Sequence, residues 1–211
     1  PSSALKFRNL LEVYAEGAQD GLRKRTEVIH AHGAKVFGQI LHLGRESTGG
    51  DAAFASCAPS PIRSPRDPFV PHEMDESEIA TVVKAFGRSA ANLKRAGGDG
   101  VEIHAAHGYL VAQFLSPSTN HRSDRYGGTA ERRQRFLIEV IESIRERCGD
   151  DFGLAVRLSA DEELVDGMEV ADTVRIATAL AAHGAVDVLN ITMGTRGQYV
   201  KDMTAPEATA A

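Results

Sequence analysis

The stretch GGDGVEIHA, residues 97–105, indicates the fold of this chain. It follows a predicted helix over residues 75–95, whose first turn has Asp75 and Glu78 at the spacing of a capping box. Its two glycines end that helix, because only glycine adopts the left-handed conformation of a helix C-cap at little cost. Alternating apolar residues from Val101 onward then predict a strand. The stretch is therefore a junction between a helix and the strand that follows it.

The same order of helix, glycine and strand occurs three more times along the chain. The other predicted helices cover about residues 11–22, 129–149 and 169–183. The strands that follow them cover residues 35–41, 154–159 and 186–191. A glycine precedes each of these strands, at Gly33, Gly149 and Gly184. Repeated helix and strand units predict parallel strands joined by crossover helices, so the fold class is α/β.

Two architectures are built from such units, an open doubly wound sheet and a (β/α)8 barrel. An open sheet is complete with about four or five strands, whereas a barrel needs eight strands and typically ~250 residues. The 211 residues are enough for one domain, and the strand count alone favours the open sheet. A proline-rich stretch at 59–71 is predicted to form a long loop after the first strand. Residues 198–211 are predicted to form an irregular tail, which leaves a domain over residues 1–197.

Composition and charge exclude several classes of function. The 24 Lys and Arg residues against 29 Asp and Glu residues give a net charge of −5, so no overall basic field is available to bind nucleic acid. The sequence has no run of ~18 uninterrupted apolar residues, and we therefore expect no membrane-spanning helix. Its two cysteines, Cys57 and Cys148, form no C-x-x-C motif. We expect neither a disulfide framework nor a cysteine-rich metal site, and we place the protein in the reducing cytoplasm.

Polar residues follow each predicted strand at its carboxyl end, where functional groups collect in parallel α/β folds. In chain order they are Gln39, His42, Gly44 and Arg45, then Glu102, His104, His107 and Tyr109, then Arg157 and Ser159, and finally Asn190, Thr192 and Gly194. A single residue of this kind often only shapes a loop. Their gathering at one rim of the sheet favours a functional site.

His104 and His107, three residues apart just after a strand, have two chemical interpretations. Two neutral imidazoles can donate paired hydrogen bonds to one carbonyl oxygen and stabilise the negative charge that develops on it during a reaction. They can also bind zinc, with Glu102, His42 or Asp124 as a third ligand. The spacing alone leaves both interpretations open.

Tyr109 and Arg157 add two further groups to this rim. A phenol ordinarily stays protonated at neutral pH, which suits Tyr109 to donate a proton to a carbanion-like carbon; a buried ring with a satisfied hydroxyl is the alternative. Arg157 lies within the apolar run 154–158, and burial of an unpaired guanidinium is costly. It is therefore expected to face an anion or a polarisable acceptor, or to form a salt bridge with Glu102.

Seven segments of the chain together resemble the old yellow enzyme family of FMN-dependent oxidoreductases. They are QILHLGR (39–45), DGVEIHAAHGYL (99–110), QFLSP (113–117), NHR (120–122), DRYGG (124–128), RQRF (133–136) and VRLS (156–159). The resemblance covers about residues 33–194. It implies a TIM (β/α)8 barrel in place of the open sheet, with only about half of the barrel, the third to the sixth strands, in this chain.

The resemblance also implies a role for five residues. Gln39 would hydrogen-bond the pyrimidine edge of FMN, and Arg157 would lie beside the flavin N1 and O2. His104 and His107 would bind the oxygen of the substrate's electron-withdrawing group, and Tyr109 would be the proton donor. No metal ion is expected at this site. Hydride would pass from NAD(P)H to FMN and then to the β carbon of an activated alkene, while Tyr109 protonates the α carbon.

The expected function is therefore NAD(P)H-dependent reduction of small α,β-unsaturated carbonyl compounds or related alkenes. Three alternatives remain at this stage: oxidative N-demethylation of a small amine by the same flavin, a metal-dependent hydrolase on a barrel, and an inactive fragment. The family often has tryptophan where this chain has Leu41, which leaves the shape of the pocket open.

Overall fold

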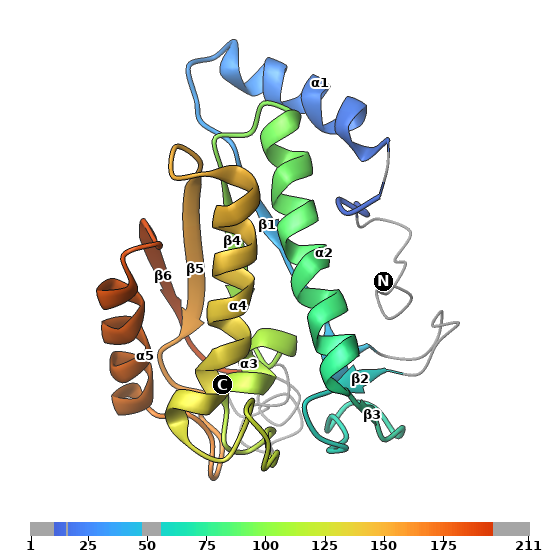
Figure 1. Cartoon of the computed structure of the whole chain (residues 1–211), viewed down its shortest axis with the longest axis vertical. Coiled ribbons are helices and arrows are strands. Elements are labelled where there is room, and N and C mark those ends of the chain that lie inside the picture. The colour runs from blue at the N-terminus through green and yellow to red at the C-terminus, as the bar shows by residue number, and fades with distance from the viewer. Residues whose placement is uncertain (1–10, 16, 48–55, 196–211) are drawn as a thin grey trace, which may run out of the picture.

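The computed structural model describes residues 11–15, 17–47 and 56–195 (Figure 1). The helices are α1 (Ala18–His30), α2 (Glu76–Arg95), α3 (Leu110–Leu115), α4 (Ala130–Cys148) and α5 (Val170–His183), with a short 3-10 helix η1 (Gly44–Glu46). The strands are β1 (Phe37–Ile40), β2 (Cys57–Ala58), β3 (His72–Glu73), β4 (Gly100–Ala105), β5 (Gly153–Ser159) and β6 (Val188–Thr192). The predicted tail over 198–211 lies outside the described residues.

Four strands form one parallel sheet in the order β1-β4-β5-β6, and β2 pairs with β3 in a separate two-stranded sheet. Residues paired in register point to the same face of a sheet. Gln39 pairs with Glu102, and Arg157 lies between His104 and Asn190. These five polar residues therefore share one face.

The opposite face of the sheet is apolar and forms the core with the helices. Its buried residues are Ile40, Val101, Ile103, Leu154, Val156 and Leu158. Helices α2 and α4 lie side by side over this face (Figure 1). The ring of Phe136 stacks on that of Phe114, with centroids 4.3 Å apart, and meets the edge of Phe86 at 6.4 Å. Burial of these apolar groups fixes which face of each strand is left for polar residues.

The order of the strands agrees with the barrel that the resemblance implies and not with the open doubly wound sheet that the strand count alone favoured. Such a sheet reverses its strand order at a switch point and has helices on both faces. Here the four main strands follow one another in chain order, without reversal. Because crossovers between parallel strands are right-handed, steps in one direction place every crossover helix on the same face. This is the arrangement of a (β/α)8 barrel, with the polar face turned toward the barrel interior.

The local signals at the helix ends are confirmed. Asp75 accepts a hydrogen bond from the Glu78 amide, and the Glu78 side chain accepts one from the Asp75 amide, so the capping box is present. The four glycines predicted to follow helices, at Gly33, Gly97, Gly149 and Gly184, all have φ between +71° and +87°. A residue with a side chain rarely adopts this conformation, so glycine is needed there.

The first helix was predicted in the wrong place. The helical spacing from Leu11 predicted a helix over about 11–22, but α1 begins at Ala18 and continues to His30. Gly17, which precedes the helix, has φ +87°, a conformation that no right-handed helix passes through. Helix α3 was not predicted, because six residues are too short to show a helical period. In the described part of the chain, no helix is long and apolar enough to cross a membrane.

Candidate functional site

The loop between β4 and α3 turns two side chains back over the end of the sheet. His107 has φ +56° and Gly108 has φ +72°, so two consecutive residues are left-handed. The amide of His107 donates to Ser159 Oγ at 3.2 Å, which fixes the loop to the end of β5. A histidine at positive φ is uncommon and costs free energy, and such positions often belong to sites. The loop is therefore held in a shape that it would not adopt by itself.

His104, His107 and Tyr109 come together at this end of β4, as the expected site requires. His107 Nδ1 lies 3.3 Å from His104 Nε2, and the two rings meet edge to face with centroids 5.1 Å apart. The ring of Tyr109 lies 5.0 Å from that of His104, centroid to centroid. His104 is buried and His107 is half-buried. Two imidazoles and a phenol thus form one cluster.

Thr192, at the end of β6, connects this cluster to Arg157. Arg157 Nη2 donates to Thr192 Oγ1 at 3.3 Å, and His107 Nε2 lies 3.1 Å from the same oxygen. The salt bridge with Glu102, one of the two roles expected for Arg157, does not form between these two described residues. The guanidinium instead shares a hydroxyl with the histidine pair.

Gln39 lies on the same face of the sheet, on the edge strand β1. Its Nε2 donates to Glu102 Oε1 at 2.6 Å, and Asn190 Nδ2 donates to Glu102 Oε2 at 2.8 Å. The carboxylate therefore joins three strands, β1, β4 and β6, beneath the histidine cluster. The sequence predicts Glu102, Asn190 and Thr192 at the rim, but these contacts across the sheet were not predicted.

The electrostatic surroundings keep both imidazoles neutral. Burial is the largest cause and, together with the electrostatic effects of His107 and Arg157, lowers the pKa of His104 to about 4, while Glu102 opposes the shift. Burial and Arg157 also lower the pKa of His107. A neutral imidazole has one N–H donor, so the pair can donate to an oxygen without adding net charge.

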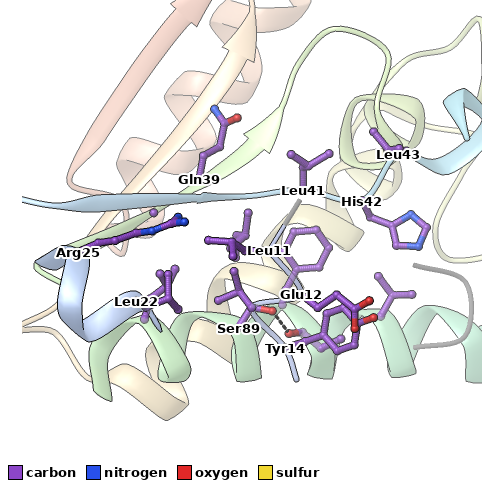
Figure 2. A pocket seen from close by; sticks show the side chains of 17 residues that line it. Leu11, Glu12, Tyr14, Leu22, Arg25, Gln39, Leu41, His42, Leu43 and Ser89 are labelled. Carbon is purple, nitrogen blue, oxygen red and sulfur yellow. Dashed lines mark hydrogen bonds between the residues drawn. The ribbon is translucent and has the colours of Figure 1, made fainter. Parts of the chain in front are cut away.

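Two expected rim residues lie elsewhere. His42 lines a cavity of about 420 Å³ between β1, α2 and residues 11–14, on the helix-facing side of the sheet (Figure 2). Arg45 is buried beside Glu46 and donates from Nη1 to the carbonyls of Ile62 and Arg63, at 3.5 and 3.3 Å. Arg45 therefore holds the loop that follows β1.

The geometry does not assemble the zinc site that sequence analysis left open. Asp124 binds Arg122, whose Nη2 lies 2.5 Å from Asp124 Oδ2. Glu102 accepts hydrogen bonds from Gln39 and Asn190, and His42 lines the cavity on the other face of the sheet. Among residues 11–15, 17–47 and 56–195, no group of three or more His, Cys, Asp or Glu side chains could hold a metal ion.

The polar face fits a group that presents acceptor atoms. Within the described ranges, buried side-chain atoms without a hydrogen-bond partner include Arg157 Nε and His104 Nδ1. Arg157 Nε carries a hydrogen in every protonation state found in proteins, and an unpaired buried donor is costly. An oxygen or unprotonated nitrogen beside Arg157 would remove that cost. The N1 and O2 atoms of FMN are acceptors of this kind, so the residues fit the flavin.

Comparison with known proteins gives the same family over nearly the whole chain. The model of the NADH:flavin oxidoreductase / NADH oxidase family matches residues 1–210. An NADH oxidase of Thermoanaerobacter brockii is 41% identical over 175 residues, which are 82% of this chain and 27% of that protein. Members of the family bind FMN and take NADH or NADPH as the reductant.

Solved structures show the same architecture. A complex of 2-naphthoyl-CoA reductase with 2-naphthoyl-CoA matches with a TM-score of 0.81 and 34% identity, over 87% of this chain and 30% of that one. An old yellow enzyme homologue from Zymomonas mobilis matches with a TM-score of 0.78 and 28% identity, over 85% and 53%. The chain thus spans between about a quarter and about a half of the proteins it matches. It belongs to the NADH:flavin oxidoreductase / NADH oxidase family, and its four parallel strands form about half of the (β/α)8 barrel of the old yellow enzyme homologues.

Proposed function

We propose that this chain supplies the substrate-binding cluster and part of the flavin site of an enzyme that reduces activated alkenes with NAD(P)H. The activity is assigned to the complete barrel, meaning this chain together with the barrel strands that it does not contain. The observation that supports the proposal best is the cluster of two neutral imidazoles and one phenol at the end of β4. FMN, when bound, supplies the hydride.

His104 and His107 would act on the oxygen of the substrate. Paired N–H donors on a carbonyl oxygen withdraw electrons from the conjugated double bond and stabilise the enolate-like charge that forms there. Because both imidazoles have lowered pKa values, they are neutral and donate hydrogen bonds to the substrate oxygen as neutral groups. This function needs an acceptor oxygen in the substrate.

Tyr109 would complete the reduction by protonation. Its ring packs against His104, so a substrate held by the histidine pair lies next to the phenol. A phenol is a general acid that remains protonated at neutral pH and can donate its proton to the α carbon. Arg157 would stabilise negative charge on the flavin, since a guanidinium stays charged throughout.

The donor cluster favours reduction of a carbonyl-conjugated alkene over N-demethylation. An amine that is protonated at neutral pH presents a cationic N–H donor, for which two N–H donors are poor partners, whereas a carbonyl presents an acceptor. One solved relative is a reductase bound to 2-naphthoyl-CoA, an acyl thioester whose carbonyl is conjugated to its ring. The substrate class that we propose is therefore a small molecule with an alkene conjugated to a carbonyl group.

The proposal is tested by measuring the two half-reactions of the complete barrel without oxygen. NADH and NADPH are expected to bleach the flavin, and 2-cyclohexen-1-one is expected to restore its colour. Trimethylamine is expected not to bleach the oxidised flavin. Bleaching by the amine together with no reoxidation by the enone would contradict the proposal and favour demethylation.

A further inference from the structure

Glu102 is the centre of a hydrogen-bond network that crosses the polar face of the sheet. One of its oxygens accepts from Gln39 at 2.6 Å and the other from Asn190 at 2.8 Å. Asn190 lies two strands away, and the residue of β5 paired with Glu102 is Ala155. The small side chain of Ala155 leaves the space through which the two polar groups meet. Both oxygens of the carboxylate thus have an amide partner.

This contact determines which way the Gln39 amide faces. The oxygen and nitrogen of a side-chain amide look alike in most structures, and only the partners decide between them. A carboxylate has no hydrogen to donate, so only the NH₂ end of Gln39 can face Glu102 at 2.6 Å. The carbonyl oxygen Oε1 is therefore turned away from Glu102. In Figure 2 the Gln39 side chain points away from helix α2 and toward the neighbouring strands.

We propose that Glu102 is a positioning residue for the cofactor: it holds the Gln39 amide so that Oε1 accepts a hydrogen bond from N3–H of the flavin. The inference rests on the proposed function and on the position of Gln39 at the pyrimidine edge. That edge has one N–H between two carbonyl groups. A reversed amide would place NH₂ against N3–H, two donors face to face, and the negative charge of Glu102 disfavours that orientation.

The proposal predicts that the effect of Glu102 depends on the hydrogen at flavin N3. FMN and 3-methyl-FMN, which lacks that hydrogen, are titrated into the apo form of the complete barrel, and binding is followed by flavin fluorescence. Glu102→Gln is expected to weaken FMN about tenfold, as for one lost hydrogen bond, because a neutral amide no longer orients Gln39. It is expected to weaken 3-methyl-FMN by less than about twofold.

Two further variants serve as comparisons. Gln39→Ala is expected to weaken FMN more than 3-methyl-FMN. Adding Glu102→Gln to this variant should cause no further loss of affinity for FMN. Glu142→Gln makes the same chemical change on the exposed surface of α4, where the side chain is 59% exposed, and should leave both affinities unchanged. A purely structural role of Glu102 would lower the two affinities by the same factor, and that result would overturn the positioning role.

A second measurement uses the unmodified sequence, so it does not depend on a variant that folds. With ¹⁵N- and ¹³C-labelled protein and ¹⁵N-labelled FMN, a scalar coupling through the hydrogen bond is expected between flavin N3 and the Gln39 carbonyl carbon. A bound flavin without this coupling, with the Gln39 NH₂ facing the ring, would overturn the inference and leave the reductase activity standing. Failure of the unmodified barrel to bind either flavin would overturn both.

Discussion

The Thr192 hydroxyl lies 3.1 Å from His107 Nε2 and accepts a hydrogen bond from Arg157 Nη2 at 3.3 Å. Because a guanidinium can only donate, one lone pair of the hydroxyl is used by Arg157. Its hydrogen and its second lone pair remain for His107 Nε2, and the tautomer of that ring decides which of the two groups donates. Thr192 therefore links the residue expected beside the flavin to those expected at the substrate oxygen.

Removing this hydroxyl should loosen the histidine pair. In the complete barrel, Thr192→Val is expected to weaken a phenol ligand by roughly 0.5–1.5 kcal/mol, the value of one ordinary hydrogen bond. Thr192→Ser keeps the hydroxyl and should restore most of the affinity. Thr178→Val is the matched control, because its hydroxyl bonds only its own helix, at the Val174 carbonyl. Equal affinities in the valine and serine variants would show that the hydroxyl has no part in binding.

Tyr109→Phe separates the two half-reactions. The variant is expected to slow alkene reduction by on the order of 10²-fold or more and to leave flavin reduction by NAD(P)H nearly unchanged, because only alkene reduction uses the phenolic proton. Stopped-flow absorbance measures both rates. Tyr126→Phe is the control for loss of a tyrosine hydroxyl, since Tyr126 is buried away from the site and donates to Glu139 at 2.9 Å. Equal slowing of both half-reactions would assign Tyr109 a structural role.

His107 can be replaced by a residue that still donates. His107→Asn should retain much of the activity, because its amide keeps an N–H donor. His107→Ala is expected to weaken a phenol ligand by roughly 1–3 kcal/mol, the cost of leaving an oxyanion without its partner. The titration is followed through the long-wavelength charge-transfer band of the bound phenol. Unchanged affinity in the alanine variant would remove His107 from the binding site, and stoichiometric zinc in the unmodified protein would replace the donor role with a ligand role.

The lowered pKa of His104 predicts how folding stability depends on pH. Its pKa is lowered to about 4 by burial first and by the charges of His107 and Arg157 second. Between about pH 6.5 and about pH 4 the unfolded chain binds a proton at this position that the folded chain does not. Protonation of His104 therefore does not lower the free energy of unfolding above about pH 6.5, its pKa in the unfolded chain. The free energy of unfolding falls as the pH drops through this window. A ¹⁵N NMR titration of the imidazole nitrogens in the complete barrel should find His104 neutral over most of the window, with a midpoint near pH 4. A midpoint near pH 6.5 would show that the ring is not desolvated.

The local part of the fold could be read from the sequence, whereas contacts across the sheet could not. A capping box and a glycine after a helix act within a few residues. The conformations of Asp75 and Gly97 therefore depend on residues close to them in the sequence. The bond from Gln39 to Glu102 joins residues 63 positions apart and depends on the register of β1 against β4. No periodicity encodes that register.

The candidate site shows the same division. The spacing of His104 and His107 at the end of a strand was enough to suggest a pair, because His104 lies in β4 and His107 in the loop that turns back over the end of that strand. The contact of Thr192 with Arg157 required the order of β5 and β6 and the depth of each residue along its strand. Four strands also gave the wrong architecture when only counted, because an open sheet and half of a barrel contain the same units.

Expression of the 211 residues alone tests how far this half of the barrel is self-sufficient. In the main sheet of the described structure, β1 and β6 each have one edge without a partner strand, and Val188, Ile191 and Met193 on or next to β6 are 50 to 60% exposed. Unpaired edge groups and exposed apolar residues favour aggregation or pairing with another chain. Gln39 and Arg157 would still be present, but contacts to FMN from the other half of the barrel would be absent, and each charge-assisted hydrogen bond lost in this way weakens the binding free energy by roughly 1.5–3 kcal/mol. We therefore expect the 211 residues to be poorly soluble, and colourless after gel filtration with added FMN. A soluble yellow preparation with near-stoichiometric flavin would show that this half of the barrel binds the cofactor by itself.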